Sequence, residues 1–101
     1  LSQEIVEDQR HITLVSKHTA EERLASLIVS ISARNARRNL SPLNIRLPMS
    51  RTDIGNFLGL TIETVSRVFS RFAKQGLIEI DKKELVVLDI DALKHIASLG
   101  H

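Results

Sequence analysis

Between residues 50 and 75, hydrophobic and polar positions follow the period of two short helices that are joined by a sharp turn. Ser50 occupies the position of an N-cap, and Asp53 follows three residues later, which resembles a capping box. We expect the first helix to run from about Arg51 to Leu58. Gly59 then ends this helix, because glycine readily adopts a positive φ.

The second helix is predicted to begin at Ile62, with Thr61 as its N-cap. At 100° per residue, its apolar and polar side chains separate onto two sides. The apolar side comprises Ile62, Val65, Val68, Phe69, Phe72 and Ala73, and the polar side comprises Glu63, Thr64, Ser66, Arg67, Ser70, Arg71 and Lys74. We expect the apolar side to be buried, and we place all three phenylalanines of the chain in the core, including Phe57.

Glycines and apolar residues recur here at the spacing of a helix-turn-helix. Two helices that cross steeply over a short turn need a small residue where they approach, a glycine at the corner and apolar side chains between them. Gly55 and Gly59 supply the first two, and the apolar positions are Ile54, Leu58, Leu60, Val65 and Val68. A helical corner in an unrelated domain would not require all of these to coincide. The pattern therefore predicts a second helix whose polar side faces the major groove of DNA.

The segment from Met49 to Ile78, MSRTDIGNFLGLTIETVSRVFSRFAKQGLI, is similar to the DNA-binding domain of the Crp/Fnr family of bacterial transcription regulators. Within it, ETVSR at residues 63–67 resembles the E-x-x-S-R recognition motif of the Fnr branch. In the Crp branch, the place of Ile62 is typically arginine and the place of Ser66 typically glycine. Both differences disfavour the alternative of a Crp-type regulator that responds to a cyclic nucleotide. The resemblance covers essentially the whole chain.

The flanking segments match the layout of that domain. Thr19 and Glu22 form a capping box that begins a helix running to about Arg37 or Arg38. Residues 39–44 are expected to form a loop and residues 45–47 a short strand. The core side of the helix is given by Leu24, Leu27, Ile28 and Ile31.

After the second helix, Gly76 is the expected stop, and two β-rich runs follow, Leu77–Ile80 and Leu85–Leu88. Their connecting turn, at residues 81–84, contains no glycine. Asp89 is expected to cap a last short helix, with Leu93 and Ile96 packed inward. A hairpin directly after a recognition helix is a wing. The predicted fold is a winged helix-turn-helix, mainly α with a small antiparallel β-hairpin.

The resemblance divides the chain into two parts. Residues 1–16 would be the end of a dimerisation helix and its hinge, although their short apolar stripe fits an ordinary amphipathic helix equally well. Residues 17–101 would be the winged-helix domain, with the helix-turn-helix at 50–75 and the wing at 77–88. Because the chain begins with Leu1 rather than methionine, we expect a fragment of a larger protein.

Composition supports a single domain with a nucleic-acid partner. The net charge is only +2, but residues 46–76 carry five basic and two acidic side chains. Cysteine is absent, and no apolar run is long enough to span a membrane, so we expect no membrane association and a cytoplasmic location. We predict that the protein is not an enzyme, because no glycine-rich phosphate loop occurs and the histidines have no metal-site or triad spacing: His11, His18, His95 and His101.

On the recognition helix, Glu63 is expected to accept a hydrogen bond from a cytosine amino group and Arg67 to donate to the N7/O6 edge of guanine. Ser66 would contact the neighbouring base step. The expected phosphate contacts lie near helix N-termini: Ser50, Arg51, Thr52, Thr61 and Thr64. The resemblance to the Fnr branch implies a TTGAT-type half-site, repeated as an inverted pair for a homodimer.

The resemblance also implies a transcription activator that has double-stranded DNA and RNA polymerase as partners. No cofactor is expected in this segment, whereas a sensory domain preceding it would hold an iron–sulfur cluster, haem or no cofactor. The alternative from another class is a winged helix that binds proteins. This use would require an apolar patch on the exposed side of the recognition helix, which the predicted polar side lacks.

Overall fold

The computed structural model describes residues 19–98 of the 101-residue chain. Within this range the chain forms four helices and three strands. The helices are α2 (Ala20–Arg37), α3 (Arg51–Leu58), α4 (Ile62–Lys74) and α5 (Ile90–Ser98), and the strands are β1 (Asn44–Arg46), β2 (Ile78–Asp81) and β3 (Glu84–Val87). The predicted fold class is confirmed. The predicted dimerisation segment, residues 1–16, lies outside the described residues.

Local capping sets the ends of the longest helix, α2. The amide of Glu22 donates to the Thr19 hydroxyl at 3.1 Å, and the amide of Thr19 donates to the Glu22 carboxylate at 2.9 Å. These are the two reciprocal bonds of the predicted capping box. At the other end, Arg34 and Arg37 lie in the last turn, where positive charge complements the helix dipole.

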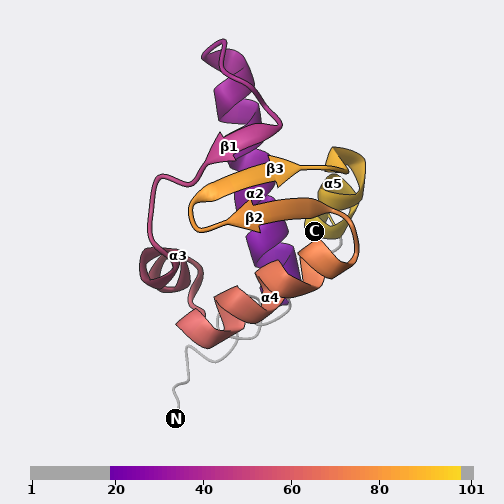
Figure 1. Cartoon of the computed structure of the whole chain (residues 1–101). Coiled ribbons are helices and arrows are strands. Elements are labelled where there is room, and N and C mark those ends of the chain that lie inside the picture. Colours follow the sequence, from indigo (N-terminus) through magenta and orange to yellow (C-terminus); the bar gives the residue numbers. More distant parts are fainter. Residues whose placement is uncertain (1–18, 99–101) are drawn as a thin grey trace.

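The three strands form an antiparallel sheet in the order β1-β3-β2. Ile45 of β1 pairs with Leu85 of β3, and Ile80 of β2 pairs with the same residue from the other side. In Figure 1 the sheet crosses in front of α2, with α4 below it and α5 beside α2. The hairpin strands lie within one residue of their predicted bounds, and β1 begins one residue earlier than predicted. By pairing with β3, the short strand β1 thus adds a third strand to the hairpin.

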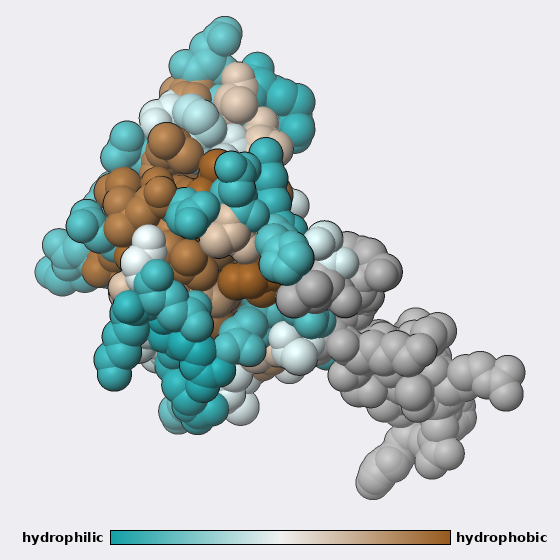
Figure 2. Space-filling view, turned by 90° about the vertical axis from the view of Figure 1, so that its right-hand side faces the viewer, coloured by the Kyte–Doolittle hydropathy of each residue, from teal (hydrophilic) through white to brown (hydrophobic). Residues whose placement is uncertain are grey.

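The core lies between α2, α4, α5 and the sheet. It contains Leu24, Ala25, Ile28, Ile45, Leu47, Ile54, Val65, Val68, Phe69, Phe72, Leu77, Ile78, Leu85, Val87 and Leu93. Asp89 accepts from the Ala92 amide at 3.0 Å, as predicted for the cap of α5. Figure 2, which faces the side that carries α5, shows apolar residues gathered in the middle and hydrophilic residues above and below. No helix in residues 19–98 is long and apolar enough to cross a membrane.

Three residues that we expected in the core are exposed. Phe57 is 70% exposed and Ile62 is 44% exposed, and Ala73 is also exposed. On α3 only Ile54 and Gly55 are buried, and Phe57 lies about 60° around the helix from Ile54, on the side away from Gly55. On α4 the buried arc ends at Phe69, so that Ile62 and Ala73 lie just beyond its edge. The predicted apolar side of the recognition helix was therefore too wide.

Candidate nucleic-acid interface

The corner between α3 and α4 places the second helix. Gly59 has a φ of 74°, as expected of the residue that ends α3. The amide of Leu60 then donates to the carbonyl of Gly55 at 2.7 Å. A Cβ atom on Gly55 would lie 2.5 Å from the Leu60 carbonyl oxygen. The small residue of the motif is therefore needed for the close approach of the turn backbone itself.

One side of α4 anchors it to the body of the domain. Thr61 caps the helix, accepting from the Thr64 amide at 3.1 Å. The buried residues of the helix are Val65, Val68, Phe69 and Phe72, each at most 3% exposed. Because these four side chains fix the rotation of the helix, the opposite side must face solvent.

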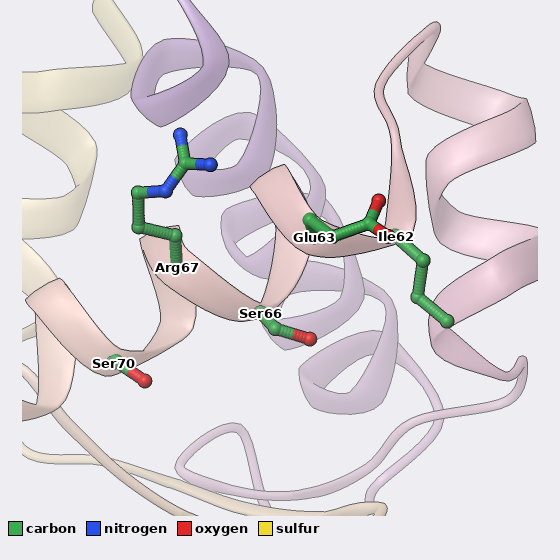
Figure 3. A pocket seen from close by; sticks show the side chains of 5 residues that line it. All are labelled: Ile62, Glu63, Ser66, Arg67 and Ser70. Carbon is green, nitrogen blue, oxygen red and sulfur yellow. The ribbon is translucent and has the colours of Figure 1, made fainter.

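The exposed side of α4 carries a shallow hollow lined by Ile62, Glu63, Ser66, Arg67 and Ser70. We call these five residues the recognition face. Figure 3 shows them projecting from successive turns of α4, with Arg67 extending to one side and the hydroxyls of Ser66 and Ser70 pointing to the other. All three predicted base-contacting residues therefore lie on one continuous surface. Sequence reasoning omitted Ser70 as a site residue, although its spacing of four residues from Ser66 places it there.

The two charged side chains of the recognition face, Glu63 and Arg67, are available to bind a partner. Among residues 19–98, no ion pair or side-chain hydrogen bond engages Glu63 or Arg67. Arg71, one turn beyond Arg67, instead pairs with Glu21 at the start of α2. The recognition face thus offers a carboxylate that can only accept hydrogen bonds and a guanidinium that can only donate them. This pair of groups suits the donor and acceptor pattern of base edges in a major groove.

The five residues predicted to contact phosphates lie at the beginnings of α3 and α4. The Ser50 hydroxyl accepts from the Asp53 amide at 3.1 Å and so caps α3. The Thr61 hydroxyl lies 2.9 Å from that of Thr64. Thr52 is exposed at the first turn of α3. Both helix starts therefore combine hydroxyls with the positive end of a helix dipole, which favours anions.

Arg51 has contacts that the sequence did not indicate. Its Nη1 donates to the carbonyl of Lys82 at 3.2 Å. Its guanidinium carbon also lies 5.1 Å from the centre of the Phe69 ring. Lys82 is at the tip of the β2–β3 hairpin, which lies at the same end of the sheet as α3 in Figure 1. The predicted phosphate contact is thus also a link between α3, α4 and the wing.

Catalytic and metal-binding groups were not expected. Among residues 19–98, no group of three His, Asp or Glu side chains could hold a metal ion. His95 is exposed on α5.

Comparison with known proteins adds family relationships to this geometry. Residues 22–96 match the family described as the Crp-like helix-turn-helix domain. The transcriptional activator protein FnrA of Stutzerimonas stutzeri is 52% identical over 89 residues, which cover 88% of this chain and 36% of FnrA. The fumarate and nitrate reduction regulatory protein of Escherichia coli K12 is 48% identical over 101 residues, covering 100% of this chain and 40% of that protein. The chain spans two fifths or less of the length of these relatives.

A solved structure has the same fold. The structure of FixK2 from Bradyrhizobium japonicum superposes with a TM-score of 0.72 at 34% identity, covering 89% of this chain and 44% of FixK2. The family match, over residues 22–96, includes the corner, the recognition face and the wing.

Proposed function

Since this chain belongs to the Crp/Fnr family of transcription regulators, we propose that it binds double-stranded DNA in a sequence-specific manner, with α4 in the major groove. The observation that carries the proposal is the recognition face, on which Glu63, Ser66 and Arg67 are exposed together beside a shallow hollow. A hydroxyl, a carboxylate and a guanidinium on one helix side provide both donors and acceptors for base edges.

Within this proposal each of the three residues has its own partner. Arg67 donates two hydrogen bonds to N7 and O6 of guanine, a geometry that the planar guanidinium favours. Glu63, one turn earlier on α4, accepts from the amino group of a cytosine. Ser66 contacts the adjacent base step. The half-site is then of the TTGAT type, and a homodimer of the whole protein binds an inverted pair of such half-sites.

The starts of α3 and α4 contact phosphates on either side of the groove. Thr61 donates its hydroxyl proton to Thr64, so that the hydroxyl of Thr64 keeps its own proton for a phosphate oxygen. At the start of α3, phosphates of the other DNA strand are contacted by Ser50, Arg51 and Thr52. These contacts position the domain on DNA and contribute affinity without selecting the sequence.

In the cell, such a domain would regulate transcription as an activator, with RNA polymerase as a further partner. This step rests on relatives that are much longer than the present chain. Any signal, and any iron–sulfur cluster or haem that detects it, would belong to a sensory domain outside this segment.

The proposal is tested by Arg67→Ala. We expect this variant to bind a TTGAT inverted repeat more weakly by about 1–3 kcal/mol and to lose much of its preference over a repeat in which adenine replaces guanine. The measurement is a fluorescence-anisotropy titration of both duplexes at several salt concentrations, because the phosphate contribution depends on salt.

Arg71→Ala is the matched control, since Arg71 is on the same helix and has the same charge but pairs with Glu21. It should keep the discrimination between the two duplexes. Full discrimination by the Arg67 variant would show that Arg67 does not contact guanine. Equal binding of both duplexes by the unmodified chain would contradict the proposed preference for the TTGAT repeat.

A further inference from the structure

The tip of the wing is held from outside the hairpin. Lys82 has a φ of 57°, in the left-handed region that side chains other than Asn and Asp rarely adopt. Both carbonyls at the tip have partners elsewhere in the domain. That of Lys82 accepts from Arg51 at 3.2 Å, and that of Lys83 accepts from the Leu47 amide at 2.8 Å. The strained conformation is therefore fixed by neighbouring elements, in the manner expected when no glycine is present.

Arg51 also contacts the recognition helix. Its guanidinium is over the ring of Phe69, 5.1 Å from the ring centre. Phe69 is only 2% exposed and is fixed in the core. A guanidinium is planar and rigid, so stacking on a fixed ring also fixes the direction of its N–H groups. Arg51 thereby sets the distance between the tip of the wing and the buried side of α4.

We propose that Arg51 is a positioning residue for the wing. It holds the exposed ammonium groups of Lys82 and Lys83 where they reach the DNA backbone while α4 occupies the major groove. The inference rests on the proposed DNA binding and adds to it a coupling: the lysines contribute to affinity only when Arg51 holds the tip. Arg51 has further N–H donors that are free to contact a phosphate directly, so a test has to separate these two roles.

The first test needs no DNA. Amide hydrogen exchange of the 101-residue chain is followed by NMR for Arg51→Ala, Arg51→Lys and the unmodified protein. The Leu47 amide is the reporter, because it donates to the carbonyl of Lys83. We expect its exchange to accelerate at least several-fold in both Arg51 variants, since lysine lacks the planar group that stacks on Phe69. The control, Lys94→Ala on the exposed side of α5, should leave it unchanged.

The second test is a double-mutant cycle on DNA affinity. Lys82→Gln and Lys83→Gln are introduced together, with and without Arg51→Ala, and binding to the TTGAT repeat is titrated at several salt concentrations. In the unmodified background the two lysine changes should lower the salt slope by about two phosphate contacts. In the Arg51→Ala background, the fold-loss of affinity caused by the same two lysine changes should be less than half of that in the unmodified background.

The possible results separate the explanations. Equal factors in both backgrounds, with unchanged Leu47 exchange, would overturn the proposal and leave Arg51 as an independent phosphate contact. Retention of full affinity by Arg51→Lys would overturn it as well, because charge alone would then suffice. If the unmodified chain does not bind DNA, the proposed function fails, whereas the exchange experiment still decides whether Arg51 holds the wing tip.

Discussion

The helix-turn-helix corner and the wing turn both reverse the chain through a residue with positive φ, yet they are stabilised differently. At the corner this residue is Gly59, with a φ of 74°, and at the wing it is Lys82, with a φ of 57°. The corner is closed by a hydrogen bond between Leu60 and Gly55, five positions apart. The wing turn depends on Arg51, which is 31 positions away.

This difference shows how far the information for a turn extends along the chain. A turn held by its own residues requires specific residue types at fixed spacing, and it can be recognised in a sequence. A turn held by distant groups tolerates an unfavourable residue, because tertiary contacts offset the cost of its backbone conformation. Three substitutions test this difference between the corner and the wing turn.

The largest effect is expected from Gly55→Ala. The new Cβ would lie 2.5 Å from the carbonyl oxygen of Leu60, which is backbone and cannot rotate away. We expect a loss of about 3 kcal/mol in the free energy of unfolding, measured by urea denaturation. The control is Asn56→Ala on the exposed side of the same helix, which should change stability by less than about 0.5 kcal/mol. Equal unfolding midpoints for the two variants would contradict the close approach.

Gly59→Val should have the second-largest effect, of order 1–3 kcal/mol. A Cβ at this position meets only Arg23, at an ordinary 3.6 Å, so the cost arises from the positive φ rather than from a clash. Gly59→Asn separates these causes, because asparagine tolerates the left-handed region better than valine does. In thermal unfolding, the melting temperature should therefore be highest for the protein with glycine at position 59, lower with asparagine and lowest with valine. An unchanged melting temperature for valine would mean that Gly59 does not determine the turn.

The smallest effect, and the only favourable one, is expected from Lys82→Gly. Relief of the left-handed strain exceeds the entropy that glycine adds to the unfolded chain, so we expect a gain of about 0.5 kcal/mol. Lys83→Gly, where φ is not positive, should lower stability by a similar amount. Differential scanning calorimetry of the two variants measures both changes. A loss of stability in the Lys82 variant would indicate that its side chain stabilises the tip.

Local chemistry was sufficient to predict much of this domain from sequence. The capping box at Thr19, the caps at Ser50 and Thr61 and the stop at Gly59 all depend on residues within four positions of one another, and the structure confirms each of them. The recognition face was predictable for the same reason. Helical period places Glu63, Ser66 and Arg67 on one side regardless of what packs on the other. Their partners on DNA remain predictions.

Tertiary structure alone decided how wide each buried surface is and where the long side chains go. Phe57 and Ile62 are apolar at helical spacing, but no element within residues 19–98 packs over them, and their exposure follows from the placement of α2 and the sheet. Arg51 and Arg71 are chemically alike in the sequence, yet one contacts the wing tip and the other pairs with the start of α2. Periodicity fixes the direction of a side chain from its own helix, whereas burial and ion pairing require a partner that is distant in the chain.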